Sequence, residues 1–316
     1  MKIRKYAALL MVLTLVAAAC SKRVETQKGP RTGQYGDPNA VKDSPTPSPK
    51  AAASVGQTGS TAPKSTSTAK PTQKATTAAG PTGVTKGPRL IDDFGAYGVP
   101  QIGRPVLQPD SGYDTINLEI DFVEGREPTP AAVNHLVALV KRESGKSVTL
   151  NGGNSFPPLG TPACNHDSIR RVTDRNRSIK SEPPVASFWV GYLNGICRLP
   201  GGGRVLGAAY FGTVVAIYKD VIEGTGPQPV SDQVEKVTLV HEFFHLIGMI
   251  NIGYKSPRPH AHPDHPTHSK NPHSVMYWAF GNEESFIAFI TNGGSPPTDF
   301  DADDRADLKD IREGRL

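Results

Sequence analysis

The sequence offers little that could form a core over its first 88 positions, and it has only 3 cysteines among 316 residues. The apolar run at residues 7–19 is too short to remain in a bilayer as a spanning helix. Residues 89–316 also lack an excess of positive charge, because 22 Lys and Arg stand there against 27 acids. The basic pI of about 9.0 therefore belongs to the N-terminal part. Nothing in the composition predicts nucleic-acid binding by the folded part.

Residues 1–20 have the layout of a secretory signal, with a basic start, an apolar run and small residues at the end. The segment from Val16 to Cys20, VAAAC, resembles a bacterial lipobox with alanine in place of the usual leucine. This resemblance implies that Cys20 is lipidated, so that the protein is exported and anchored to the outer membrane or the cell surface. A soluble periplasmic or secreted protein is the alternative.

Residues 21–88 consist mainly of Pro, Thr, Ser, Ala, Gly and Lys, a composition that buries too little apolar surface to fold. We therefore expect a disordered tether at residues 21–88 and one folded domain at residues 89–316. If Cys20 is lipidated, Cys164 and Cys197 remain as a possible disulfide in an oxidising compartment. Two buried free thiols are the alternative.

The folded part contains both strand and helix patterns. Segments rich in β-branched and aromatic residues predict strands at residues 116–123, 147–150 and 187–193 and within 204–220, whereas residues 151–184 are expected to be a long irregular connection. Helices are expected at residues 130–144, between Thr129 as N-cap and Gly145 as stop, and at about 231–248, with Asp232 and Glu235 at capping-box spacing. This order predicts an α+β fold in which a mixed sheet packs on helices.

The motif HEFFH at residues 241–245 lies in the second predicted helix. His241 and His245 are four residues apart, so both imidazoles face the same side and can bind one Zn²⁺ ion. Zinc with three protein ligands keeps one position for water, whose proton Glu242 can accept and pass to a leaving amine. The motif therefore predicts a zinc metalloendopeptidase with Glu242 as general base and then general acid.

Two features after this motif resemble the metzincin clan of zinc metallopeptidases. Gly248 extends the pattern to HExxHxxG, and residues 274–277, SVMY, are similar to the methionine turn that lies beneath the zinc in that clan. Met276 would be the methionine of this turn. Most metzincins have their third histidine at the position of Asn251, where we instead expect asparagine to end the helix or turn the chain.

The spacing after Asn251 resembles that of archaemetzincins, in which the third histidine is followed by Cys, four residues, a second Cys, one residue and Met. His268-Ser269, four residues and Ser274-Val275-Met276 repeat this spacing with serine in both cysteine positions. On this alignment His268 is the third zinc ligand, after an inserted loop, and His265 and His262 are the alternatives. The loss of both cysteines removes whatever pairing or second metal site they provide in the family.

The resemblance implies a metzincin-like catalytic domain that binds peptide or protein substrates along an exposed edge strand, to which residues 206–220 are similar. Tyr277 would either stabilise an oxyanion or pack with the aromatic residues that follow it. A scaffold that binds zinc without catalysis is one alternative. A gluzincin is another, in which Glu283 or Glu284 would be the third ligand. The sequence does not predict an oligomeric state.

Five aspartates near the C-terminus match positions of a calcium-binding loop, namely Asp299, Asp301, Asp303, Asp307 and Asp310. Asp304, however, stands where that loop needs glycine. The alternative is a helix with acids in its first turn that continues through Leu308 and Ile311. We expect the helix.

Overall fold

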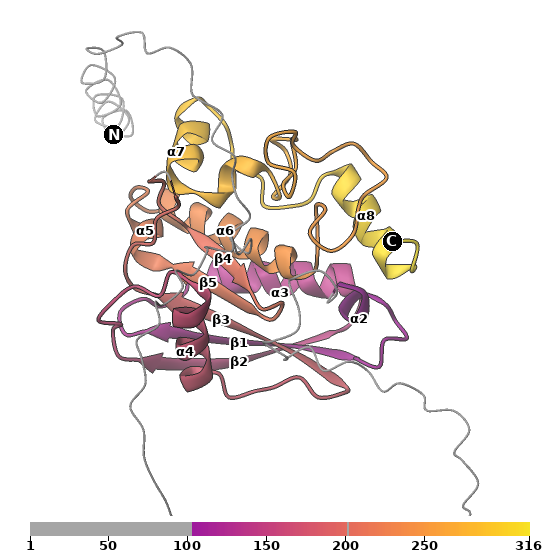
Figure 1. Ribbon diagram of the computed structural model, residues 1–316, viewed down its shortest axis with the longest axis horizontal. Helices are drawn as coiled ribbons and strands as arrows, with labels where there is room; N and C mark the ends of the chain where they lie inside the picture. Colours follow the sequence, from indigo (N-terminus) through magenta and orange to yellow (C-terminus); the bar gives the residue numbers. More distant parts are fainter. Residues whose placement is uncertain (1–102, 201) are drawn as a thin grey trace, which may run out of the picture. The chain divides into compact units, whose positions relative to one another are not determined.

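The computed structural model describes residues 103–200 and 202–316, which are coloured in Figure 1. The predicted signal sequence, the lipidation site and the tether lie outside these residues. Among the described residues, none of the helices has both the length and the apolar character that crossing a membrane requires.

A five-stranded sheet with the strand order β2-β1-β3-β5-β4 lies at the core of the described part. Its strands are β1 (Thr115–Val123), β2 (Ser147–Phe156), β3 (Val185–Leu193), β4 (Gly207–Tyr210) and β5 (Val214–Tyr218). Four strands are parallel, whereas β4 pairs with β5 in antiparallel orientation and forms one edge. The α+β class with a mixed sheet is confirmed.

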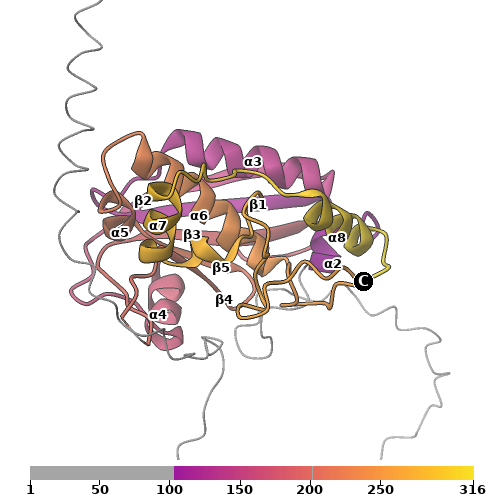
Figure 2. The same cartoon turned by 90° about the horizontal axis from the view of Figure 1, so that it is seen from above.

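Helices α3 (Pro130–Ser144) and α6 (Val230–Leu246) pack side by side on the sheet (Figure 2). The Thr129 side chain caps α3, and Gly145 ends it with a left-handed φ of 70°, as predicted. Rings of Phe188 on β3 and Phe243 on α6 lie 5.0 Å apart at their centroids. This buried contact packs α6, which carries the HEFFH motif, against the central strand.

The prediction of an irregular connection at residues 151–184 was wrong in two places. Strand β2 continues to Phe156, and Gly152 and Gly153 take positive φ values where its register with β1 shifts. Helix α4 (His166–Asn176) follows, and it begins with a capping box between Asn165 and Ser168. The disulfide between Cys164 and Cys197 ties the start of this helix to the chain after β3.

Helix α6 confirms the predicted helix, but the predicted capping box of Asp232 and Glu235 is wrong. The first turn of α6 follows Pro229, and no side chain caps it. Glu235 is fully buried and accepts a hydrogen bond from the Thr129 backbone N–H at 2.7 Å. Its other oxygen pairs with Lys219. Because both oxygens are engaged between the starts of α3 and α5, Glu235 cannot turn back to cap its own helix.

The remaining elements are α2 (Gly103–Leu107), α5 (Lys219–Glu223), the 3-10 helix η1 (Trp278–Gly281), α7 (Glu283–Thr291) and α8 (Ala302–Arg312). A capping box between Asp301 and Asp304 starts α8. The preference for a C-terminal helix over a calcium-binding loop is therefore confirmed.

Candidate metal centre

Three imidazoles from two segments meet above the C-terminal half of α6. His241 and His245 lie one helical turn apart, and their Nε2 atoms are 3.0 Å from each other. The ring of His268 stacks on His241 at a centroid distance of 5.2 Å and lies 4.9 Å from the ring of His245. One nitrogen of each ring lies within 4.8 Å of the other two. Such a set can hold one metal ion.

The protonation of these histidines suits a metal ligand. The Nδ1 of His241 lies 2.9 Å from the backbone carbonyl of Val275, so it carries the hydrogen and Nε2 keeps a free lone pair. Burial lowers the pKa of His241 to about 4. Burial, together with the neighbouring imidazoles, also lowers the pKa of His245 and of His268. All three rings are therefore neutral near pH 7, the form that binds zinc.

The distance between the ligand nitrogens also fits a zinc ion. Tetrahedral coordination with Zn–N bonds of about 2.0–2.1 Å places the ligand nitrogens about 3.3 Å apart. The Nε2 atoms of His241 and His245 are close to that separation, and two lone pairs that face each other at 3.0 Å repel unless a cation or a proton lies between them. The residues present therefore fit a zinc ion.

Asn251 takes part in the turn after α6. It has a left-handed φ of 60°, and Gly248 before it has a φ of 92°. Its side chain donates to the Pro266 carbonyl at 3.1 Å and accepts from the Ser256 N–H at 3.2 Å. Asn251 thus joins the two ends of the inserted loop, and this loop carries His268 back to the position of the third imidazole.

The side chain of Glu242, on α6, contacts the edge strand β4. This side chain is buried and accepts a hydrogen bond from the backbone N–H of Ala209 on β4. Burial raises the pKa of Glu242 to about 8, although the Ala209 hydrogen bond opposes this shift. A dication bound by the adjacent imidazoles would favour the carboxylate and lower this pKa. With the metal bound, Glu242 would therefore be held in its carboxylate form, which can accept a proton.

Met276 lies in the turn that contacts His241 and is fully buried. Tyr277 follows it, half-buried, with its ring 5.6 Å from Phe280 and 5.7 Å from Phe289. The Tyr277 ring therefore belongs to the aromatic cluster at η1 and α7, which agrees with the packing interpretation.

The alternative third ligands do not join the group formed by His241, His245 and His268. His265 stacks on Trp278 at 4.6 Å, and the ring of His262 lies 4.9 Å from His265. Glu283 is buried and forms an ion pair with Arg204. Among the described residues, two groups could hold a metal ion, and neither group contains His262, His265, Glu283 or Glu284. The geometry thus favours His268, and it gives no support to a gluzincin site.

A second group of potential ligands contains His260, Asp301 and Asp304. The two ring nitrogens of His260 face carboxylates, with Nε2 2.8 Å from Asp307 and Nδ1 3.3 Å from Asp304. Although burial alone would lower it, these carboxylates raise the pKa of His260 to about 10. The ring is therefore an imidazolium near pH 7, and it has no lone pair for a metal.

The sequence analysis did not predict this role of His260. It also missed Gly207 and Ala209 of β4, which approach Glu242. His260 and Asp307 are 47 residues apart, so no local spacing connects them. For β4, the small residues of Gly207-Ala208-Ala209 were a usable signal of close approach by another backbone.

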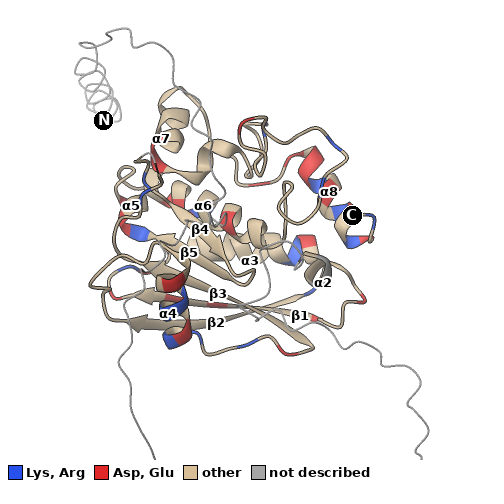
Figure 3. Ribbon diagram, viewed as in Figure 1, with Lys and Arg blue, Asp and Glu red and all other residues tan. Residues whose placement is uncertain are grey.

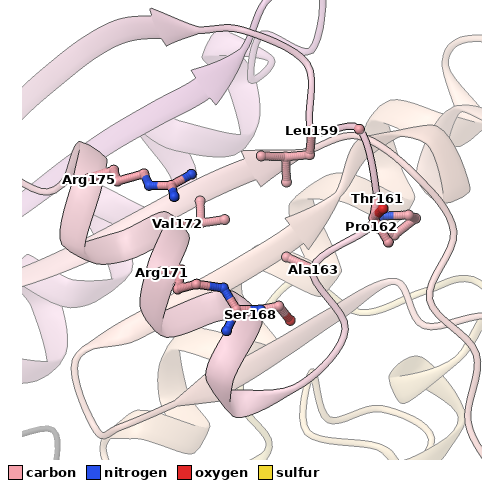
Figure 4. A pocket seen from close by; sticks show the side chains of 9 residues that line it. Leu159, Thr161, Pro162, Ala163, Ser168, Arg171, Val172 and Arg175 are labelled. Atoms are coloured by element: carbon pink, nitrogen blue, oxygen red, sulfur yellow. The ribbon is translucent and has the colours of Figure 1, made fainter.

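A separate hollow of about 230 Å³ lies between α4 and residues 159–163 (Figure 4). Apolar side chains such as Leu159 and Val172 line it, together with Arg171 and Arg175. None of the three clustered histidines contributes to its lining.

A scan of the chain against protein-family models gives no match, and a search of the curated proteins gives none. Among solved structures, the archaemetzincin of Methanopyrus kandleri is similar at 15% identity and a TM-score of 0.43, over 65% of this chain and 98% of that one. A zinc-dependent peptidase of Methanocorpusculum labreanum has 16% identity and a TM-score of 0.38, over 61% and 99%. The archaemetzincin of Archaeoglobus fulgidus, complexed with malonate, has 16% identity and a TM-score of 0.34, over 61% and 99%. Similarity at this level does not establish an activity. Any activity has to be inferred from the side chains of the histidine cluster and Glu242.

Proposed function

We propose that this protein is a zinc-dependent endopeptidase. His241, His245 and His268 hold the metal, and Glu242 accepts a proton from water and then delivers it to the leaving amine. The observation that carries this proposal is a cluster of three imidazoles that can hold one metal ion, together with the buried carboxylate of Glu242 on the same helix as two of them. A site that only stored zinc would have no use for that carboxylate.

Zn²⁺ held by these imidazoles would supply Lewis-acid activation of water and of the scissile carbonyl. Glu242 follows His241 directly on α6, and in this proposal its carboxylate moves the proton. The Ala209 N–H holds the Glu242 carboxylate toward β4. General acid and base action of this kind contributes roughly 10²–10⁴-fold to a rate.

We propose that peptides bind as an additional strand along β4. In the described sheet, β4 pairs with β5 only, which leaves its other edge without a strand partner. Peptide addition to such an edge uses main-chain hydrogen bonds and tolerates many sequences. Because Glu242 accepts from Ala209 of the same strand, a bound peptide would lie next to the proton-transfer group.

The test combines zinc stoichiometry with peptide hydrolysis in the full chain and in two variants. Glu242→Gln keeps an acceptor for the Ala209 N–H, so it should bind zinc normally and lose at least 100-fold in kcat. His268→Ala should lose both zinc affinity and activity. Full activity in Glu242→Gln would refute the peptidase mechanism, whereas unchanged zinc affinity in His268→Ala would refute only the third ligand.

We also propose that Cys20 carries a lipid anchor. The signal-like residues 1–19 and the lipobox-like VAAAC support this proposal. In a bacterial host, Cys20→Ser should abolish incorporation of labelled fatty acid and release the protein from membranes. Equal labelling of the variant and the wild type would contradict it.

A further inference from the structure

The turn at residues 274–276 determines how His241 presents its free nitrogen. The Val275 carbonyl accepts from Nδ1 of His241 at 2.9 Å, so a displaced carbonyl would rotate the imidazole or change its tautomer. Several hydrogen bonds hold this turn. The Val275 N–H donates to the Asp299 carbonyl at 2.9 Å, the Met276 carbonyl accepts from the Ser269 N–H at 2.8 Å, and the Met276 N–H donates to the Ser274 hydroxyl at 2.8 Å.

Ser274 connects this turn to helix α8. Its hydroxyl accepts from Met276 and donates to Oδ2 of Asp304, and both Ser274 and Asp304 are completely buried. A buried hydroxyl that both accepts and donates has a single orientation. A shift of the Asp304 carboxylate would therefore also move the Ser274 hydroxyl and the backbone of the turn.

An ionic network behind Ser274 fixes Asp304. The other oxygen of Asp304 lies 3.3 Å from Nδ1 of His260, whose Nε2 is 2.8 Å from Asp307. Arg258 then pairs with Asp307 and with Asp310. Figure 3 colours acidic residues red along the ribbon of α8, the helix that supplies all three aspartates. Buried charges that are paired in this way resist displacement, because separating any pair leaves an uncompensated charge.

We propose that Ser274 and Asp304 are positioning residues for the zinc ligand His241. The inference rests on the proposed zinc centre and goes beyond it, since neither residue belongs to the His241, His245 and His268 group. Asp304 orients Ser274, Ser274 fixes the Val275-Met276 turn, and the Val275 carbonyl holds His241 with Nε2 free. Partners that orient metal-binding histidines are typically worth 10–100-fold in metal affinity.

The decisive variant is Ser274→Ala in the full chain, because it removes one hydroxyl and leaves every charge in place. Zinc affinity is measured by competition with a chromophoric chelator, and the visible spectrum of the Co²⁺-loaded protein reports the ligand geometry. We expect zinc binding about 10–100-fold weaker and an altered cobalt spectrum. Ser144→Ala is the matched control. The Ser144 hydroxyl is also buried, donates to the Val140 carbonyl and accepts from the Lys146 N–H, but it lies outside this network, so its loss should lower thermal stability and leave zinc affinity unchanged.

A double-mutant cycle tests the route through Ser274. Asp304→Asn alone should weaken zinc binding to a similar extent as Ser274→Ala, and adding it to Ser274→Ala should cost no further affinity. If Asp304→Asn fails to fold, the zinc affinity of Ser274→Ala alone tests the positioning role. Wild-type zinc affinity and an unchanged cobalt spectrum in Ser274→Ala overturn the inference, even if its stability falls. Fully additive losses of affinity in the cycle overturn the proposed route.

These outcomes are distinct from failure of the proposed peptidase. A wild-type chain that binds zinc but cleaves no peptide would refute the enzyme, while a weakened zinc site in Ser274→Ala would still establish the positioning role. A wild-type chain that binds neither Zn²⁺ nor Co²⁺ overturns both.

Discussion

Gly207 on β4 should be essential for the placement of Glu242. A Cβ added at Gly207 would lie 2.8 Å from Cγ of Glu242, 2.9 Å from Cγ2 of Thr238 and 3.2 Å from Cδ1 of Ile217. Contacts below 3.0 Å cannot persist, so Gly207→Ala must separate β4 from α6 or push the Glu242 side chain away. Thr238 has a short, stiff side chain on the helix and cannot yield by rotation alone.

The magnitude follows from these contacts. Overpacking a buried site by one methyl group costs about 1–3 kcal/mol, which should lower the Tm by several degrees for a domain of this size. A displacement of the catalytic carboxylate by the order of 1 Å can cost roughly 10²-fold in rate. We therefore expect Gly207→Ala to lose 10–100-fold in kcat, while zinc affinity changes little because the three histidines do not contact Gly207.

The assay compares kcat, KM, zinc affinity and thermal unfolding of Gly207→Ala with those of Gly160→Ala. Gly160 is exposed, and a Cβ there meets no atom within 4 Å, so its replacement should leave all four quantities near wild type. Wild-type kcat and stability in Gly207→Ala would refute the proposed contact between β4 and Glu242.

Three further predictions concern stability. Loss of the Cys164–Cys197 disulfide, which closes a loop with a sequence separation of 33, should lower the free energy of unfolding by about 3–4 kcal/mol. Denaturant titration of Cys164→Ser/Cys197→Ser measures this, and no change would mean that the loop is held without the bond. Because the pKa of His260 is raised from 6.5 to about 10, its contribution to stability should be complete below pH 6.5 and be lost as the pH rises towards 10. Relative to His260→Gln, the wild type should lose up to about 1.4 kcal/mol per pH unit in that window, and parallel curves for the two proteins would contradict the imidazolium. Finally, zinc at 100 times its dissociation constant should stabilise the chain by about 2.7 kcal/mol, as measured by thermal unfolding with and without a chelator, and His245→Gln should lose this response.

The sequence predicted those parts of the site that depend on local spacing. The i, i+4 histidines of α6 needed only a helix, and the cap and stop of α3 are set by Thr129 and Gly145 themselves. The position of His268 came from motif spacing. The residues that hold the site in place were not readable in this way, because His260, Asp304 and Ala209 meet their partners across long separations in the chain.

Residues 151–184, which were wrongly predicted to be an irregular connection, also depend on contacts that local sequence does not show. Helix α4 buries only Ile169, Val172 and Thr173, too few to mark a helical stripe among its arginines and aspartates. The Asn165–Ser168 capping box was the one local sequence signal for the N-terminus of this helix. Strand β2 carries Asn and Gly beyond Leu150, residues that seldom favour strands, and its extension to Phe156 depends on pairing with β1.

The covalent ring formed by residues 164–197 bears on how this protein would withstand a cut in its backbone. The ring encloses α4 and β3, the middle strand of the sheet. Ser178 and Lys180, on the connection between them, are exposed, although the buried Glu119 carboxylate accepts from the Ser178 and Ile179 N–H groups. A cut at this connection would leave both fragments joined through sulfur, with β3 still hydrogen-bonded on both sides. A molecule cut once at this connection would therefore stay assembled.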